Sequence, residues 1–407
     1  MIGPFGLRPR GTMSARALPL ARALARLGHR VKVVLPAWDW PADAGRVWHD
    51  AGVQVCTLPA GGRRPGRASP WLTWEMLRAA LVPQPDVLHA FKPVGYAGMV
   101  ALLSSLKPGR RFAVVVDMDD LEGRAGWAPL VSRTRLEAWL RDAQERWALR
   151  HADALTAASR NLREMALAAG MSAERVLLLR NGCEPAQPPA GSPAWRAERA
   201  AARRRLGLAG DEPALLWATR FGEANPRRAA GLIAALLSQR PDARLLIAGA
   251  GQSPEAEARF WDALAGLNLS QREKVVSMGW LEPAAWRAVV LAADIGIMPL
   301  EDTAINRARC PAKAPQMLAW GLPLVAERVG EVTYYLADTA AGRLCPPGDE
   351  QAFVMAALDM LERRPAPRQT ATLAAQWDWG RLAGELAALY ECLNTTAPAC
   401  FGRRARR

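Results

Sequence analysis

The sequence has no apolar run approaching the ~20 residues that a helix needs to cross a bilayer. Its opening, M-I-G-P-F, also lacks the charged start and the long apolar stretch of a secretory signal peptide. Apolar residues make up 50% of the chain and charged residues 23%, which is typical of a globular protein. We therefore expect a cytoplasmic protein.

Cysteine and histidine are also scarce, with six and four residues in the chain. The cysteines form no C-x-x-C pair and have no histidine cluster nearby, so the sequence indicates neither a zinc site nor a disulfide framework. We expect reduced thiols at all six positions. These positions are Cys56, Cys183, Cys310, Cys345, Cys392 and Cys400.

Acidic residues are too few to balance the basic ones, and the net charge is +14. One interpretation is a general bias toward arginine, and the other is attraction to an anion such as a diphosphate or a lipid headgroup. Nucleic acid is not expected as a partner, because no binding module or regular basic-aromatic pattern is present. Arg63, Arg64 and Arg67 precede Trp71 in a Gly/Pro-rich loop, which suits either an anionic membrane surface or a solvated loop.

Short apolar runs alternate with helical patterns along most of the 407 residues, a length that predicts two or three domains. The expected strands lie at 31–35, 53–56, 87–91, 112–116 and 154–158, and after a break at 215–218, 244–248, 275–277, 295–298 and 324–326. The break, at 183–212, contains a proline-rich stretch and an Arg-rich helix, which indicate a linker. This order predicts two doubly wound α/β domains, each with a parallel sheet covered on both faces.

The start of the first domain departs from this pattern. A buried strand should precede the first glycine loop, but only Met1 and Ile2 precede Gly3. Either this strand is a stub or the coding sequence begins upstream, and we favour an upstream start. Gly11 follows, just before a helix that begins near Ser14. Its backbone N–H could face an anion or a sugar, although an ordinary tight turn explains it equally well.

Two segments of the second domain follow strands at the edge where doubly wound sheets bind ligands. Arg220 follows the strand at 215–218, and a guanidinium there can bind a diphosphate through two parallel hydrogen bonds. The alternative is an ion pair with a neighbouring carboxylate such as Glu223. The G-A-G at 249–251 follows the next strand, but without a third glycine it more often marks a plain turn.

The most specific stretch begins with C-P-A-K at 310–313 and ends with the strand at 324–326. A long loop delivers Lys313 to the start of a helix, which ends at Gly321 and leads into that strand. A cation at a helix N-terminus suits a phosphate or a ribose. V-G-E at 329–331 and P-P-G-D at 346–349 follow at fixed distances.

This pattern resembles the retaining GT-B glycosyltransferases of family four, whose string is P-x-K-x-x-(E)-x-M-A-x-G-x-P-V-V-A. G-H-R-V at 28–31, N-G at 181–182 and W-D-W at 377–379 match further family positions. The resemblance implies a GT-B fold, with two Rossmann-like domains facing a central cleft. The implied segments are an acceptor-binding domain at 1–182, a linker at 183–212, a nucleotide-sugar-binding domain at 213–370, a returning helix at 371–393 and a basic tail at 394–407.

The resemblance also implies transfer of a sugar, with retention, from a nucleotide-sugar donor and without a cofactor or a bound metal. We predict a hexosyltransferase that acts on a cell-envelope glycan or a lipid-linked acceptor, with peripheral contact to an anionic membrane. Arg220 and Lys313 are the predicted catalytic residues, because they would neutralise the departing diphosphate. The predicted donor-binding residues are Gly11, Arg227, Gly251, Leu281 and Gln316.

Two departures from the family pattern concern the donor. The family places a glutamate three residues after the lysine and another eight residues before that one. Here these positions hold Gln316 and Ala308. Gln316 retains hydrogen-bonding capacity for a ribose, and Asn306 or Glu301 on the same loop can replace the upstream glutamate.

A further departure concerns the acceptor. Where many family members carry a histidine, the chain has D-M-D-D at 117–120, which looks like the metal-binding D-x-D of the other glycosyltransferase fold. Because GT-B enzymes need no metal, we expect Asp117 and Asp119 to bind acceptor hydroxyls, with metal ligation and helix capping as alternatives. His89 and Lys92, at the end of the strand 87–91, are expected to face the same crevice.

Two other functions stay open. One is a different GT-B enzyme, such as a nucleotide-sugar epimerase or a phosphorylase, although the spacing around Lys313 speaks against it. The other is a non-catalytic partner that keeps the fold, which Ala308 and Gln316 leave open.

Overall fold

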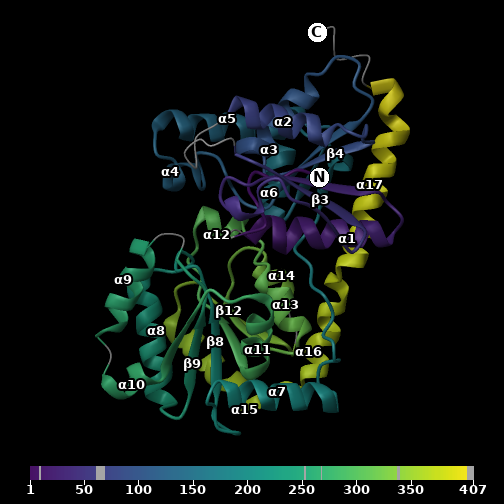
Figure 1. Cartoon of the computed structure of the whole chain (residues 1–407). Coiled ribbons are helices and arrows are strands. Elements are labelled where there is room, and N and C mark those ends of the chain that lie inside the picture. Colours follow the sequence, from purple (N-terminus) through teal and green to yellow (C-terminus); the bar gives the residue numbers. More distant parts are fainter. Residues whose placement is uncertain (9–10, 61–68, 252–253, 267, 337–339, 401–407) are drawn as a thin grey trace. The chain divides into compact units, whose positions relative to one another are not determined.

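The computed structural model describes residues 1–8, 11–60, 69–251, 254–266, 268–336 and 340–400, with only the backbone of 395–400. The chain forms two compact units (Figure 1). The first unit comprises Met1–Gly182, Ala308–Cys310 and the described chain from Trp379 onward. The second comprises Cys183–Arg307 and Pro311–Asp378. Arg63, Arg64 and Arg67, which were considered for a membrane surface, lie outside the described residues. Most of the basic tail predicted at 394–407 lies outside them as well.

The strands of the first unit follow the order of a doubly wound sheet. They are β1 (Val31–Pro36), β2 (Val47–Asp50), β3 (Val53–Leu58), β4 (Val87–Phe91), β5 (Ala113–Met118), β6 (Ala154–Ala157) and β7 (Val176–Leu178). The first three pair in the order β1-β3-β2, with β2 antiparallel, and the last four pair in parallel in the order β4-β5-β6-β7. Ile2 forms parallel bridges to Val34 on β1 and to Ala90 on β4, so a one-residue stub stands where the first strand was expected. The upstream start remains a prediction.

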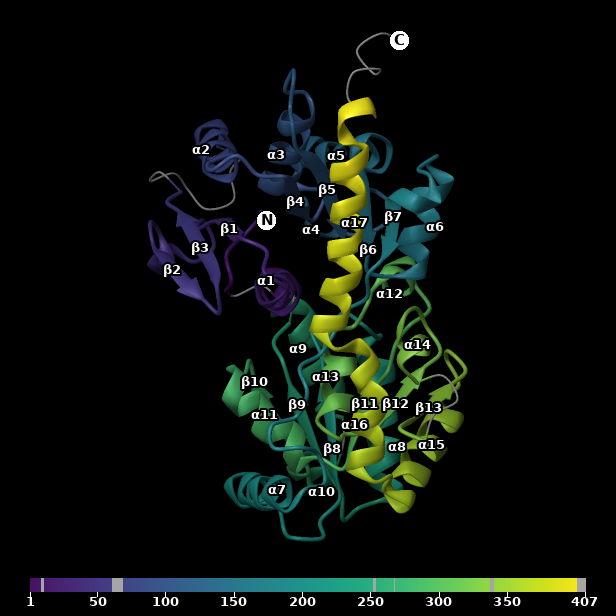
Figure 2. The ribbon, with the colours of Figure 1, turned by 90° about the vertical axis from the view of Figure 1, so that its right-hand side faces the viewer.

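Helices cover both faces of this sheet. They are a π-helical turn at Met13–Ala17, α1 (Leu18–Arg26), α2 (Pro70–Ala80), α3 (Gly95–Ser105), α4 (Ala128–Val131), α5 (Arg135–His151), α6 (Arg160–Ala168) and α17 (Trp379–Cys400), with short 3₁₀ turns at Pro41–Asp43 and Ala173–Arg175. Buried side chains of α2, α3, α5 and α6 form one core with the sheet, and those of α1 and α17 form the other. α17 packs along α1 and against β5 (Figure 2). The first unit is therefore a three-layer α/β/α domain.

The second unit has one six-stranded parallel sheet, in the order β10-β9-β8-β11-β12-β13. Its strands are β8 (Ala214–Ala218), β9 (Arg244–Ala248), β10 (Val275–Gly279), β11 (Ile295–Met298), β12 (Leu324–Glu327) and β13 (Gly342–Cys345). Its helices are α7 (Pro193–Arg205), α8 (Pro226–Gln239), α9 (Pro254–Leu264), α10 (Leu269–Glu273), α11 (Pro283–Ala292), α12 (Ala304–Ala308, whose last residue belongs to the first unit), α13 (Lys313–Ala319), α14 (Val332–Leu336), α15 (Glu350–Arg363) and α16 (Pro367–Ala374), with a 3₁₀ turn at Ala375–Trp377. The strand order reverses between β8 and β11, and in open α/β sheets this reversal places the ligand crevice at the carboxyl ends of the two strands.

The prediction of two Rossmann-like, doubly wound domains is confirmed, with differences at the edges. Residues 183–212, expected as a linker, belong to the second unit, where Arg199 and Arg203 of α7 pair with Asp294. The last helix that joins the first unit begins at Trp379, because the expected segment from 371 is divided between α16 and α17. None of the described helices is both long and apolar enough to span a membrane.

Candidate functional site

In the second unit, the loop after β8 is held in a fixed shape at the point where the strand order reverses. The Glu223 carboxylate accepts hydrogen bonds from the Thr219 hydroxyl at 3.0 Å and from the backbone N–H of Arg220 at 3.1 Å. Phe221 adopts φ +58°, which is rare for a residue with a side chain. It is buried against Trp217. Glu223 thus organises the backbone that carries the Arg220 guanidinium.

The loop after β9 lies directly against this loop. Gly249 has φ +139°, and a Cβ built on it would lie 1.8 Å from the carbonyl oxygen of Thr219. Only glycine fits this position. Gly251, predicted to bind the donor, instead donates its backbone N–H to the Glu257 carboxylate at 2.8 Å. Gly249 therefore serves close packing between neighbouring loops, and donor binding by Gly251 stays a prediction.

The loop after β11 is tied to the loop after β8 by Asn306. Its side-chain amide donates to the carbonyl oxygens of Glu223 at 2.7 Å and of Glu301 at 2.8 Å. Asn306 is 4% exposed, and its Oδ1 has no hydrogen-bond partner within the part of the chain that the structure describes. An unpaired buried acceptor costs free energy, so this oxygen is available to a ligand donor.

Lys313 lies at the start of α13, where its side chain keeps contact with solvent although the surrounding protein desolvates much of the ammonium. Its ammonium lies 4.2 Å from the ring centroid of Trp286, in the first turn of α11. Desolvation lowers the pKa of Lys313 to about 8. No carboxylate pairs with this ammonium among the described residues, so its positive charge is left for a bound anion.

The remaining residues predicted to bind the donor differ in their surroundings. Arg227 is exposed in the first turn of α8, while the neighbouring Arg228 forms a two-pronged ion pair with the fully buried Glu327. Gln316 exchanges hydrogen bonds with the backbone of Glu184, at 3.2 and 3.3 Å, so its amide is already engaged within the unit. A further predicted residue, Leu281, is half-buried between β10 and α11.

In the first unit, Asp117 is enclosed and does not face a crevice. It is the next-to-last residue of β5 and is fully buried, and its carboxylate accepts two hydrogen bonds from Arg16, at 2.6 and 2.8 Å. A third hydrogen bond comes from the Thr156 hydroxyl. Burial alone would raise the pKa of Asp117, but the Arg16 charge and these hydrogen bonds lower it. The expected contact between Asp117 and an acceptor hydroxyl would require breaking this pair.

His89 belongs to the same buried network and is equally enclosed. Its Nε2 lies 3.2 Å from the Thr156 hydroxyl, and its Nδ1 lies 2.6 Å from the Tyr390 hydroxyl of α17. Burial lowers the pKa of His89 to about 3, so the ring is neutral at neutral pH. Tyr390 then donates to Nδ1, and Nε2–H donates to Thr156. The predicted exposure of His89 to the crevice is not what the structure shows.

Lys92 and Asp119 meet in a cluster of charges after β4 and β5. The Lys92 ammonium lies 2.7 Å from Asp119, 3.0 Å from Asp120 and 2.6 Å from Glu122. Lys92 itself has φ +70°. The oxygens of the three carboxylates lie within 4.8 Å of one another, close enough to bind a metal ion, but the ammonium already supplies their counter-charge. Burial raises the pKa of Asp119 to about 6 despite the charge of Lys92.

Two glycines near the N-terminus, Gly3 and Gly11, differ in the space around them. A Cβ at Gly11 would meet nothing within 4 Å, whereas a Cβ at Gly3 would lie 2.5 Å from the sulfur of Met13. The close approach therefore occurs at Gly3. Gly11 is half-exposed and is the first residue of the helical segment, which was predicted to begin near Ser14, and its binding of the donor stays a prediction.

Both units match known family models. Residues 11–182 match a glycosyl transferase 4-like domain, and residues 212–363 match the glycosyl transferases group 1. The chain belongs to the group 1 glycosyltransferases. No curated protein matches it in sequence.

Solved structures confirm the GT-B fold of this glycosyltransferase. Sucrose-phosphate synthase from Thermosynechococcus elongatus is similar with a TM-score of 0.68 and 21% identity, over 95% of this chain and 94% of that chain. HepE from Anabaena, in complex with UDP and glucose, has a TM-score of 0.67 and 14% identity, over 96% and 98% of the two chains. WaaG, a glycosyltransferase involved in lipopolysaccharide biosynthesis, has a TM-score of 0.65 and 17% identity, over 96% and 99%.

Several residues that shape the two units of this glycosyltransferase escaped the sequence analysis. Arg16 lies in the helix predicted to begin near Ser14 and is 1% exposed, and an arginine among apolar helix positions is a signal for a buried partner. Glu327, at the end of an apolar strand, carries the same signal. The positive φ of Phe221 and of Lys92 has no signal in the sequence.

Proposed function

We propose that this glycosyltransferase transfers a hexosyl group, with retention of configuration, from a nucleoside diphosphate sugar to an acceptor. The observation that carries the proposal is the ammonium of Lys313, which has a lowered pKa and no acidic partner among the residues described for its unit. A diphosphate beside this ammonium supplies the missing counter-charge and raises the pKa again, so the lysine stays protonated while the donor is bound.

Two further cations lie on segments that follow the carboxyl ends of the strands in the sheet of the second unit, as the segment with Lys313 does. Arg220 follows β8 where the strand order reverses, and Arg227 opens α8, whose dipole adds positive potential at its N-terminus. Charge develops on the diphosphate as the sugar departs, and preorganised cations stabilise that charge more than they stabilise the bound donor. The three cations therefore act chiefly on the leaving group.

The buried Oδ1 of Asn306 supports the proposal from the sugar side. It is an acceptor on the loop after β11, and a hydroxyl of the donor sugar is a suitable hydrogen-bond donor. This residue replaces the acidic contact that Ala308 cannot make. The proposal of retention rests on the resemblance to retaining enzymes. The proposal of a nucleotide-sugar donor is supported by the similarity to HepE, which was solved with UDP-glucose. The similarity to WaaG supports a cell-envelope glycan or a lipid-linked acceptor.

The test is a panel of nucleotide-sugars that differ in base and sugar, measured first by thermal shift. A ligand that binds only the native state at a hundred times its Kd adds about 2.7 kcal/mol to stability and raises the Tm. One donor should raise the Tm of the wild type but not of Lys313→Ala, and Arg204→Gln on exposed α7 is the matched control. Product analysis with that donor should then show a new glycosidic bond. An epimerised donor without transfer would replace the proposal with the epimerase alternative.

A second candidate, a non-catalytic partner with the same fold, is favoured by one observation. The two acidic positions of the family hold Ala308, which is fully buried in the first unit, and Gln316, whose amide is engaged by Glu184. Donor binding without turnover, with acceptors extracted from cell envelopes, would select this candidate. Turnover with any of these acceptors excludes it.

A further inference from the structure

The first unit carries an unusual apolar surface on one layer of helices. α3 packs beside both α2 and α5, and these helices cover one face of the sheet. The described residues include seventeen large apolar side chains that are exposed, of which the second unit contributes only three. Ten belong to α2, α3, α4 and α5 or directly follow α3: Trp71, Trp74, Met99, Leu103, Leu106, Leu130, Val131, Leu136, Trp139 and Leu140.

The spacing of these side chains shows that they share the outward faces of their helices. On α5, Leu136, Trp139 and Leu140 follow one another at helical i, i+3 and i+4 positions, and they are 65%, 50% and 47% exposed. The opposite face of α5 buries Ala148 and Leu149 in the core. An exposed apolar surface of this kind is typical of an interaction site.

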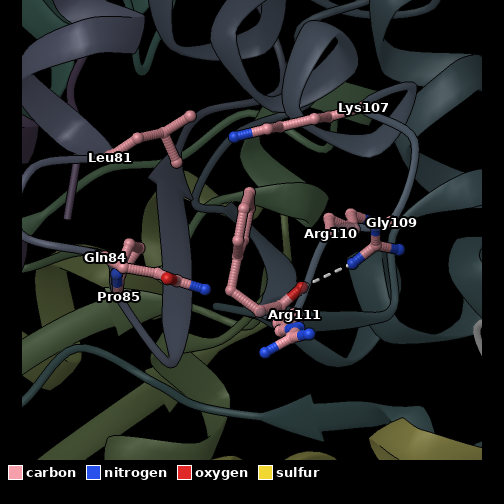
Figure 3. Close-up of a pocket in the computed structure, with 8 residues that line it drawn as sticks. Leu81, Gln84, Pro85, Lys107, Gly109, Arg110 and Arg111 are labelled. Atoms are coloured by element: carbon pink, nitrogen blue, oxygen red, sulfur yellow. Dashed lines mark hydrogen bonds between the residues drawn. The ribbon is translucent and has the colours of Figure 1, made fainter.

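A basic pocket adjoins the end of this layer. It has a volume of about 260 Å³ and lies between the loop after α2 and the loop after α3 (Figure 3). Lys107 and Arg111 lie on opposite sides of it, and its lining contains no carboxylate. Arg110 is neutralised by Asp153, at 2.6 and 2.8 Å, whereas Lys107 and Arg111 have no acidic partner among the described residues.

Exposed apolar and basic residues alternate around the pocket and the start of α5. Val82 and Leu106, 64% and 66% exposed, neighbour the lining residues Leu81 and Lys107 in the chain. Arg133 and Arg135 precede Leu136 and are exposed, without an acidic partner for either guanidinium in the described part of the chain. The surface therefore combines apolar side chains with uncompensated positive charge.

We propose that the outward face of α2, α3 and α5, together with the pocket of Lys107 and Arg111, docks onto an anionic lipid bilayer. Tryptophan prefers the boundary between headgroups and acyl chains, and Trp71, Trp74 and Trp139 are all exposed on this face. The two unpaired cations bind headgroup phosphates. A second copy of the chain fits less well, because a symmetric dimer would bring two surfaces of the same positive charge together.

The proposal extends the proposed function, since a lipid-linked acceptor lies in such a bilayer, but its test does not depend on transfer. The full chain is mixed with phosphatidylcholine vesicles that contain about 30% phosphatidylglycerol, and with phosphatidylcholine alone, and the vesicles are sedimented. The protein should sediment with the anionic vesicles at low salt and much less with the neutral ones. Raising the salt concentration should weaken the binding, because salt screens the charges.

Two double variants separate the contributions. Lys107→Gln with Arg111→Gln should weaken vesicle binding about thirtyfold, at about fivefold for each charge near an anionic surface. Trp139→Ser with Leu140→Ser should weaken it about tenfold or more, because apolar area no longer enters the bilayer. The controls are Arg204→Gln with Arg205→Gln, which also removes two positive charges, and Trp280→Ser with Leu269→Ser, which replaces the same pair of residue types at exposed positions of the second unit. All of these positions are exposed, so the melting temperatures should stay close to that of the wild type.

Vesicle binding that is equal in both double variants and their controls would overturn the proposal. So would a dimer seen by sedimentation velocity that Trp139→Ser with Leu140→Ser dissociates, without vesicle binding by the wild type. The thermal shift with a nucleotide-sugar contains no vesicles, so its result does not depend on the docking surface. A failed docking surface is therefore distinguishable from a failed proposed function.

Discussion

The enclosed position of Asp117 leads to a prediction that opposes its expected role in binding the acceptor. In Asp117→Asn the Arg16 guanidinium, 1% exposed, loses its counter-charge. Removing one partner of a buried ion pair costs about 3–5 kcal/mol of unfolding free energy. At about 3 °C per kcal/mol for a domain of this size, the Tm of the first unit should fall by about 10 °C.

The pH dependence provides a second measure of the same pair. The folded pKa of Asp117 is lowered, so its contribution to stability is present above the ordinary aspartate pKa of about 3.9 and is lost as the pH falls below it. The wild type should therefore lose stability more steeply than Asp117→Asn below about pH 4. Arg16→Met with Asp117→Leu removes both charges and should recover part of the loss.

Calorimetry of the three proteins and transfer kinetics well below the melting temperature are the measurements. The folded fraction of Asp117→Asn should keep a KM for the acceptor close to that of the wild type. An unchanged Tm together with a large rise in that KM would refute the structural role and restore the binding role.

The remaining predictions concern catalysis and the glycine loops. Arg220→Ala and Lys313→Ala should each lower kcat about a hundredfold, or about 3 kcal/mol, with a smaller effect on donor binding. Arg220→Lys should recover only part of the lost activity. Normal turnover in stable variants would remove the catalytic assignment. Transfer should persist in excess EDTA, because an ammonium already fills the acidic cluster of the first unit, and a complete loss that Mn²⁺ or Mg²⁺ restores would contradict this. Gly249→Ala should lower the unfolding free energy by at least about 2 kcal/mol, because its Cβ would meet the carbonyl oxygen of Thr219. Gly11→Ala, with open space around the new Cβ, should be nearly neutral. Equal melting curves of the two variants would show that the Gly249 loop relaxes.

Most strands that the sequence predicts correctly owe their apolar character to burial on both faces, and the partly buried edge strand β10 is an exception. β5 is the clearest case, with every residue buried. The strands that were missed carry a weaker pattern, because β2 is half-exposed, β7 has three residues and β13 begins at Gly342. These three lie at sheet edges, where fewer neighbours demand apolar side chains.

The candidate site was predictable to the extent that strand ends define it. Arg220 was placed at the correct edge because the carboxyl ends of parallel strands meet there. Partners of buried charges were not predictable, since Arg16 and Asp117 are 101 residues apart in the chain. The same holds for Lys92, which the sequence places after a strand without revealing the three carboxylates around its ammonium.

The return of α17 to the first unit has a consequence for synthesis on the ribosome. Trp379, Leu382 and Leu386 complete the core that covers α1, yet they are made after all of the second unit. The second unit can therefore fold first. The apolar face of α1, with Leu20 and Leu24, stays uncovered by α17 until about two hundred further residues have been synthesised. A nascent chain halted before Trp379 would carry a finished second unit beside an uncovered face, and it would be a substrate for chaperones during that interval.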